Sequence, residues 1–329
     1  MGAFEGLVEL TDLNLGSNRL TSKSLPENIF QGLVSLQKLD TSTNYFYDNY
    51  PYFQSEISKV RSLVKLQIDL DRRHQIDKSL CNLLKLQDLG IFAPFGQIFS
   101  DNLFQNLKCL KIEILSLYVV SSLAPDTFIS FPSLKTLRIM ISHREAAYDA
   151  ISSIFNSFKV FKGKNMTEIS ITQNPHRNGE KTHIKRSTGN DVYESFCLPK
   201  TLEELDLHSN VKEHTMKGIA HTTIINGSNL KTLKLANITF RDCDGTIFGI
   251  ENLEYLDISG FICKVLSEHL LSQFPKLITL IARDASLGLG LNTLTDASEF
   301  LKMNLDLQHI DSDAKSHKFL TRWFISSSI

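Results

Sequence analysis

The sequence predicts an α/β solenoid, a coil of short repeats curved into a horseshoe with a parallel β-sheet on its concave face. The motif L-x-x-L-x-L-x-x-N-x-L at residues 10–20 returns at residues 36–46, which is 26 residues later. Leu13 and Leu15 alternate with polar neighbours, as in a half-buried strand. Asn18 stands where that strand must turn, and a buried amide there can satisfy backbone groups. One such unit cannot bury its apolar edge, whereas a stack of units can.

Motif and period together are the leucine-rich repeat signature, which predicts a single solenoid domain over residues 1–329. The spacing is irregular, and Asp71 replaces the asparagine of the third unit. The fifth unit is ambiguous, because Leu110 fits the pattern as well as Leu107. We predict about twelve repeats, which start at Leu10, Leu36, Leu63, Leu86, Leu107, Leu134, Met166, Leu202, Leu230, Leu253, Leu277 and Leu307.

A second apolar pattern precedes most repeats and predicts the core beneath the strands on the convex side. Its members recur in pairs three residues apart: Phe4 and Leu7, Phe30 and Leu33, Leu80 and Leu83, Phe128 and Phe131, Ile247 and Ile250, Leu271 and Phe274.

Two repeats are long and predict insertions. Residues 144–158 have apolar residues at helical spacing and predict a helix. Residues 174–198 contain Pro, Gly and Asn and show no apolar period before Val192, so we expect a long exposed loop. Excess length in a repeat protein is expelled from the stack, often onto a functional face.

The residue between the two strand leucines should face outward on the concave side. Down the stack these residues mix both charges and give no field of one sign, so they imply no ligand class. His208 also falls at an outward position and is expected to be a surface histidine. The predicted series is Asn14, Asp40, Gln67, Gly90, Lys111, Arg138, Ser170, Asp206, Lys234, Asp257, Ile281 and Asp311.

Composition and motifs exclude several classes. The net charge is −1, so no global preference for nucleic acid or an anionic membrane is indicated. No metal-binding spacing, phosphate loop or nucleophile motif occurs, and Asp242 and Asp244 lack the other ligands of a calcium loop. We therefore expect no enzyme, no metal and no cofactor.

The termini and cysteines leave the compartment open. We see no signal peptide at the N-terminus and no apolar run of membrane-spanning length. The five cysteines are widely spaced and odd in number, which predicts free thiols. Sequons at Asn165, Asn226 and Asn237 are tentative glycosylation sites, in a number that chance alone would give.

The segment that begins the predicted loop is the one dense basic stretch, with Arg177, Lys181, Lys185 and Arg186, and His183 among them. These five residues are our tentative ligand-binding site. Clustered cations can hold an anionic ligand, and a histidine adds charge below about pH 6.5. The alternative is a solvated insertion, and nucleic acid is therefore only a hypothetical partner.

The pattern of residues 4–20, followed by residues 25–46 and 292–311, resembles the ectodomain of a Toll-like receptor. The resemblance covers nearly the whole chain and includes irregular repeat lengths, the Phe spacing and interrupted Asn positions. Receptors of that family also have a signal peptide, cysteine-rich caps, a membrane span and a signalling domain, none of which we find here. We therefore expect a partial chain with apolar edges at Leu7 and Leu10, and at Trp323, Phe324 and Ile325.

The resemblance implies an extracellular pattern-recognition ectodomain of innate immunity that binds a microbial ligand or a protein partner and pairs as a homodimer or heterodimer. The alternative is an intracellular leucine-rich repeat adaptor or substrate-recognition subunit. The missing signal peptide favours the adaptor, while the sequons and the Phe spacing favour the receptor.

Overall fold

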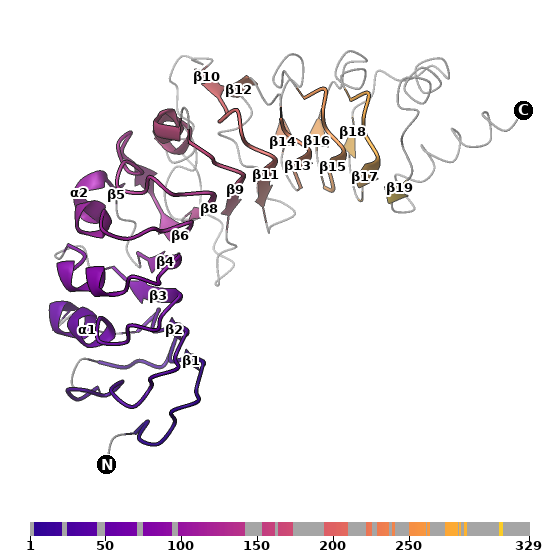
Figure 1. The fold of residues 1–329 in the computed structure, drawn as a ribbon. Coiled ribbons are helices and arrows are strands. Elements are labelled where there is room, and N and C mark those ends of the chain that lie inside the picture. The colour runs from indigo at the N-terminus through magenta and orange to yellow at the C-terminus, as the bar shows by residue number, and fades with distance from the viewer. Residues whose placement is uncertain are drawn as a thin grey trace, which may run out of the picture. The chain divides into compact units, whose positions relative to one another are not determined.

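The structure is a computed structural model that divides into two compact units, Met1–Glu145 (unit 1) and Ala146–Ile329 (unit 2). Figure 1 shows the course of the chain by colour. The prediction of a single domain concerns the relation between the units and stays a prediction. The structure describes residues 3–21, 25–44, 50–70, 75–93, 98–141, 153–161, 164–173, 194–209, 222–225, 229–236, 239–240, 250–260, 262–263, 274–281, 283, 286–287 and 309–311.

Unit 1 is a parallel sheet with one strand from each repeat. Its strands pair in the order of the chain, and Leu13, Leu39, Leu66, Leu89, Leu115 and Leu137 occupy one register row. The strands are β1 (Asp12–Asn14), β2 (Lys38–Asp40), β3 (Lys65–Asp69), β4 (Asp88–Phe92), β6 (Ile114–Val120) and β8 (Thr136–Ile141).

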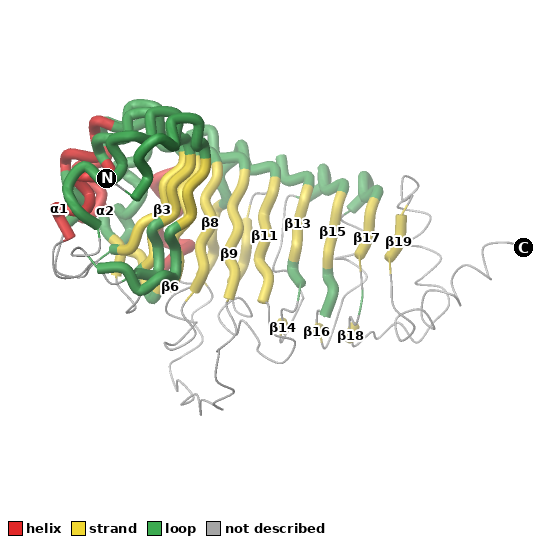
Figure 2. Tube along the Cα trace, turned by 90° about the horizontal axis from the view of Figure 1, so that it is seen from below, coloured by secondary structure: helices red, strands yellow, loops and turns green. Residues whose placement is uncertain are grey.

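Unit 2 repeats this arrangement. Strand follows strand in chain order, with Ile169, Leu205, Leu233, Leu256, Leu280 and Ile310 in the equivalent row. Figure 2 shows the strands of unit 2 side by side. The strands are β9 (Glu168–Gln173), β11 (Glu204–Ser209), β13 (Thr232–Lys234), β15 (Tyr255–Asp257), β17 (Thr279–Ile281) and β19 (His309–Asp311).

Short elements complete each coil behind the sheet. In unit 1, Figure 1 shows α1 and α2 on one side of the strands. These elements are α1 (Tyr50–Ile57), η3 (Lys78–Asn82), α2 (Asp101–Phe104), η4 (Gln105–Leu107), β5 (Ile98–Phe99) and β7 (Ser122–Leu123). In unit 2 they are η5 (Phe158–Phe161), β10 (Glu194–Cys197), β12 (Thr222–Ile225), β14 (Thr239–Phe240), β16 (Ile262–Cys263) and β18 (Ser286–Leu287). The predicted leucine-rich repeat solenoid with a parallel sheet is therefore confirmed.

The core consists of the strand leucines and the second apolar pattern. Members of that pattern are at most 3% exposed at Phe30, Leu33, Leu80, Leu83, Phe128, Phe131, Ile250 and Phe274. Leu7 is 46% exposed and Leu10 is half-buried, so Leu7 departs from the predicted core pattern and agrees with the apolar edge predicted at these two residues. Ile247, Leu271 and the predicted apolar edge at Trp323, Phe324 and Ile325 lie outside the described residues.

The buried amide of the motif is at Asn44 rather than at the exposed Asn18. Its Oδ1 accepts hydrogen bonds from the backbone N–H groups of Asn18 and Leu20, at 3.0 and 2.9 Å. Its Nδ2 donates to the carbonyl oxygens of Leu15 and Thr41 at 2.7 and 3.0 Å. One side chain of the second repeat therefore satisfies the turn of the first, which links neighbouring coils without apolar contact.

Asp69 does the same for the next turn. Its two carboxylate oxygens accept hydrogen bonds from the backbone N–H groups of Thr43 and Asn44, at 2.7 and 2.8 Å. The sequence assigned this role to Asp71, which lies outside the described residues; Asp69, two residues earlier, makes the contacts because it ends β3 beside that turn. Burial raises the pKa of Asp69 to about 6, although the two N–H groups act in the opposite direction.

The predicted start of the fifth repeat was wrong. Leu115 pairs with Leu89, so this repeat begins at Ile112 rather than at Leu107 or Leu110. Leu107 and Leu110 are both buried before the strand, and their spacing imitates a repeat start. The outward residue is therefore Ser116, in register with Gly90, and not Lys111.

The two predicted insertions are only partly described. Residues 153–157 are helical and continue into η5, which confirms the end of the helix predicted over 144–158. The predicted loop over 174–198 was wrong at its end, because Glu194–Cys197 form β10 and Leu198 is 4% exposed. Phe196 pairs with Ile224 in a second parallel ladder, which stabilises this segment as a strand. Residues 174–193 lie outside the described residues.

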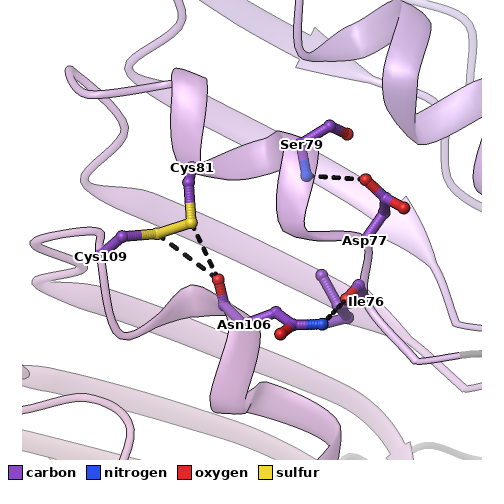
Figure 3. The surroundings of a disulfide bond; sticks show 6 residues. All are labelled: Ile76, Asp77, Ser79, Cys81, Asn106 and Cys109. Atoms are coloured by element: carbon purple, nitrogen blue, oxygen red, sulfur yellow. Dashed lines mark hydrogen bonds between the residues drawn. A yellow bond between two sulfur atoms is a disulfide. The ribbon is translucent and has the colours of Figure 1, made fainter.

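Cys81 and Cys109 form a disulfide bond between neighbouring repeats, so the prediction of free thiols was wrong for this pair. Their sequence separation of 28 is close to one repeat, which brings η3 and the end of η4 side by side with a Cα–Cα distance of 5.7 Å. Figure 3 shows both sulfur atoms beside the carbonyl oxygen of Asn106, at 3.0 and 3.4 Å. Asn106 also donates to the carbonyl oxygen of Ile76 at 2.9 Å, so an amide and a covalent bond join the same two coils.

Candidate functional site

The predicted ligand-binding residues Arg177, Lys181, His183, Lys185 and Arg186 lie outside the described residues. The same holds for the sequons at Asn226 and Asn237, and for Asp242 and Asp244. Asn165 is described and exposed, directly before the repeat that contains β9. Its accessibility is what a glycosylation site requires, and the assignment itself stays a prediction.

The open face of the unit 2 sheet has a cluster of charged side chains. Strand side chains alternate between the core and the open face, so the residues flanking Leu205 and Leu207 face outward and are half-buried. Glu204 lies beside Glu168, and Asp206 lies in one row with Lys234 and Asp257. These positions, together with His208, make up what we call the acidic face.

Two short ion pairs organise the acidic face. Nδ1 of His208 lies 2.6 Å from Oδ1 of Asp206, two residues away on the same side of β11. Nζ of Lys234 lies 2.5 Å from Oε1 of Glu204 on the neighbouring strand. The side chains of His208 and Asp206 are only 30% and 16% exposed, so water screens this pair less than it would a fully exposed pair.

The hydrogen bond to Asp206 raises the pKa of His208, and this effect outweighs the lowering by burial. The charge of the acidic face therefore changes at a pH above the ordinary histidine value, where His208 loses its proton. With His208 neutral, the acidic face has the carboxylates of Glu168, Glu204, Asp206 and Asp257 and the ammonium group of Lys234. Such a surface attracts cationic groups of a ligand. No group of three or more His, Cys, Asp and Glu in the described part of the chain is arranged to hold a metal ion.

The open face of the unit 1 sheet has a different character. Its two strand lysines pair with carboxylates on neighbouring strands, Lys38 with Asp12 at 2.8 Å and Lys65 with Asp88 at 2.9 Å. The rings of Phe92 and Tyr118 stack on adjacent strands, with centroids 4.0 Å apart and planes 11° apart. These pairs leave unit 1 without a comparable acidic surface among its described strands.

A side chain at Gly90 would be crowded. A Cβ there would lie 2.9 Å from Cγ of Gln67 and 3.5 Å from Cε2 of Tyr118. The absence of a side chain therefore lets these two groups close over the strand.

Part of the acidic face was predicted from the sequence. Asp206, Lys234 and Asp257 were in the outward series, and His208 was assigned correctly to an outward position. Glu168 and Glu204 were missed, because only one outward residue per repeat was considered. The alternation of strand side chains would have identified both, since each lies two residues before a residue of that series.

Comparisons with known proteins support the fold. No protein-family model matches the chain, and no curated protein matches it. Among solved structures, the Toll–Spatzle complex of Drosophila matches with a TM-score of 0.52 and 14% identity, covering 92% of this chain and 40% of that chain. The mouse RP105/MD-1 complex matches with a TM-score of 0.50 and 17% identity, covering 97% of this chain and 49% of that chain.

The chain thus spans less than half the length of these two proteins. It is a leucine-rich repeat solenoid, and its resemblance to Toll-like receptor ectodomains is confirmed at the level of the fold. None of the described helices is long and apolar enough to cross a membrane.

Proposed function

We propose that the chain is a ligand-binding part of an extracellular receptor of the Toll-like type, and not an enzyme. The observation that carries this proposal is the disulfide bond between Cys81 and Cys109. Disulfides persist in oxidising compartments and are rare in the cytosol, where thiols are kept reduced. Cys109 is exposed, so a cytosolic reductant would have access to it. The bond therefore favours the receptor over the intracellular adaptor.

Ligand binding is assigned to the acidic face of unit 2. Repeat solenoids offer extended sheet surfaces to their partners, and this one combines charge with partial burial. A protein ligand with exposed Lys or Arg side chains fits four carboxylates held on neighbouring strands. Binding of this kind should weaken as salt rises, because added ions shorten the range of the attraction, which is about 8–10 Å at ordinary ionic strength.

The compartment is tested by expressing the chain behind a signal peptide and, separately, in the cytosol. In the secreted protein, alkylation without reductant should spare Cys81 and Cys109, and peptide mapping should recover them crosslinked. Glycosidase treatment should shift the gel mobility of the secreted protein, and Asn165→Gln should remove part of that shift. A secreted protein with free thiols at both positions and no glycan would support the intracellular adaptor.

The ligand assignment has its own test. The mouse and Drosophila complexes named above contain protein partners, and a basic protein of known structure, such as a histone-like or cytokine-like domain, can serve as a first probe. The double variant Asp206→Asn with Asp257→Asn should weaken binding of such probes, while Asp12→Asn in unit 1 should not. Equal binding by all three proteins would remove the acidic face from consideration.

A further inference from the structure

Four neighbouring strands of unit 1, β3, β4, β6 and β8, are each preceded by the same tight turn. In each turn a backbone N–H donates to the carbonyl oxygen three residues earlier. Because the strands are neighbours in a parallel sheet, the turns lie side by side along the edge where the strands begin. The turns run from Val60 to Leu63, from Leu83 to Leu86, from Leu107 to Leu110 and from Phe131 to Leu134, with distances of 3.2, 2.9, 2.9 and 3.4 Å.

Basic residues recur at these turns or directly after them, and all of them are exposed. The surrounding residues 57–141 contain eleven basic and seven acidic residues, although the whole chain has a net charge of −1. The excess of positive charge is therefore local to this part of unit 1. We call the row of basic residues the basic edge: Arg61, Lys85, Lys108, Lys111 and Lys135.

Two members of the basic edge are already paired. Nζ of Lys108 lies 3.1 Å from Oδ2 of Asp101, and Nζ of Lys135 lies 3.0 Å from Oε2 of Glu113. The other three members make no ion pair with the residues that the structure describes. The basic edge therefore presents three cations to solvent whose charge is not neutralised within the described part of the chain.

The matching turns of unit 2 show that this charge is not required by the fold. The same hydrogen bond closes the turns from Pro199 to Leu202, from Ile250 to Leu253 and from Phe274 to Leu277, at 3.0, 3.0 and 3.2 Å. The exposed charged residues at these turns and directly after them are two lysines and three glutamates: Lys200, Glu203, Glu251, Glu254 and Lys276. One turn geometry thus accepts either sign of charge, and only unit 1 concentrates cations on it.

The arrangement of the cations favours a linear polyanion. Four strands at about 4.8 Å spacing place the turns over roughly 15 Å along one line. Exposed cations grouped in this way attract an anionic partner, and Arg and Lys donate charge-assisted hydrogen bonds to its oxygens. The four turns and the residues directly after them contain no aromatic residue. Single-stranded nucleic acids are held by stacking on aromatic side chains as well as by charge, so the basic edge fits sulfate groups better than bases.

The disulfide bond lies within this surface. Cys109 stands between Lys108 and Lys111, and its bond to Cys81 fixes the third turn to the repeat before it (Figure 3). A surface that is held in place before binding loses less conformational entropy when a ligand binds. The same bond favours an extracellular location, where sulfated polysaccharides occur.

We infer that the basic edge of unit 1 binds a sulfated polysaccharide. The choice of an extracellular polymer rests on the compartment in the proposed function. The affinity for sulfate groups rests only on the side chains of the basic edge, and it is separate from ligand binding by the acidic face of unit 2. The inference is therefore tested with purified protein, whose behaviour does not depend on the compartment.

The test is a titration of a fluorescent heparin oligosaccharide with the purified whole chain, and the same oligosaccharide without its sulfate groups is the control probe. The wild type should bind heparin, should bind the desulfated probe more weakly, and should release heparin as salt rises. A triple variant of unit 1 should bind heparin at least about tenfold more weakly and with a smaller salt dependence, because three cationic contacts are lost. This variant combines Arg61→Gln, Lys85→Gln and Lys111→Gln.

The matched control removes the same charge from unit 2. It combines Lys200→Gln, Lys231→Gln and Lys276→Gln, all of them exposed at or directly after the turns before strands, and it should bind heparin nearly as the wild type does. Because the replaced side chains are exposed, both triple variants should keep the unfolding transition of the wild type, which circular dichroism verifies. The comparison is repeated in a background that removes the other basic stretch of the chain, with Arg177→Ser, Lys181→Ser, Lys185→Ser and Arg186→Ser.

Several results would overturn the inference. The first is a wild type that fails to bind heparin at about 50 mM salt, where electrostatic binding is strong. Equal weakening by the two triple variants would show that only the net charge of the chain matters. Tighter binding of a single-stranded RNA or of vesicles with anionic lipid than of heparin would assign the basic edge to another partner. None of these results would change the disulfide and glycan mapping that tests the proposed function.

Discussion

At the turn before the strand, two repeats of unit 1 place Val34 and Leu84 in solvent, whereas two repeats of unit 2 place Glu251 and Pro275 at the equivalent position. On the open face of the sheet the contrast runs the other way. Unit 1 has mutually neutralised ion pairs and a stacked aromatic pair there, and unit 2 has an excess of carboxylates. The repeat pattern fixes the buried leucines and leaves these positions free to vary, so the two units present different surfaces on one type of backbone.

The units also differ in what links neighbouring coils. In unit 1 a covalent bond joins two repeats, and the Asn44 and Asp69 side chains satisfy the turns of the repeats before them. In unit 2 the Thr201 hydroxyl donates to the carbonyl oxygens of Lys164 and Met166, and the Asn229 amide donates to that of Lys200, in addition to the strand ladder and the apolar core. The following changes test how far each support matters, from the largest expected effect to the smallest.

Truncation of a strand leucine should have the largest effect, and it should differ between the units. Leu205 is 1% exposed and pairs with Ile169 and Leu233 on both sides, so Leu205→Ala should cost about 2–5 kcal/mol. Leu13 is only half-buried and lies in β1, whose one partner among the described strands is β2, so Leu13→Ala should cost less. Chemical denaturation measures both, and equal losses would contradict the difference in burial.

Removal of the disulfide should come next. Replacing Cys81 and Cys109 by Ser releases a loop of 28 residues in the unfolded chain and should lower the free energy of unfolding by about 2–4 kcal/mol. Reductant should bring the wild type to the level of this double variant. The variant itself should not respond to reductant; if it does, another cysteine pair contributes.

Replacement of Asp69 by Asn tests the polar link between coils. One of the two backbone N–H groups would then face an amide nitrogen instead of an oxygen. The loss of this hydrogen bond should lower the free energy of unfolding by about 1–3 kcal/mol. The pH dependence should change as well. Because the folded pKa of about 6 lies above the ordinary 3.8, this carboxyl group stabilises the fold fully below about pH 3.8 and loses that contribution as pH rises through about 6.

Stability curves from pH 3.5 to 7 should therefore differ in slope between the wild type and Asp69→Asn. The substituted amide does not titrate, so the variant should lack the part of the decline that the wild type shows between about pH 4 and 6. Parallel curves would mean that Asp69 has an ordinary pKa in the folded protein.

Titration of His208 should give the smallest effect. Its raised pKa means that the pair with Asp206 stabilises the fold fully below the ordinary value of 6.5 and is lost as pH rises through the folded pKa. In NMR titrations, Asp206→Asn should lower the pKa of the His208 ring. An unchanged pKa would show that Asp206 does not act on the histidine.

Much of the fold could be predicted from sequence, because the spacing of Leu36 and Leu39 indicates where the strand lies and which of its side chains are buried. The fifth repeat could not, since Leu107 and Leu110 are as apolar as true repeat starts and only the ladder at Leu115 separates them. The disulfide was missed for a related reason. Cysteines 28 residues apart look unrelated until the coil brings consecutive repeats together.

The candidate site was less accessible to sequence reasoning. An ion pair such as Lys234 with Glu204 depends on strand register, and register follows from the whole stack rather than from either segment. The exposure of Leu84 is equally hidden in the sequence, where it is one leucine among many. Only its place at the centre of a turn separates it from the buried Leu83 beside it.

The pairing of each strand with the next has a consequence for biosynthesis. Leu13 finds its partner Leu39 only 26 residues further along, and Cys81 meets Cys109 after 28. A ribosome that adds about 5–20 residues per second delivers such a partner within a few seconds. Each coil can therefore close on the one made just before it, and in an oxidising lumen the crosslink can form while the second half of the protein is still being translated.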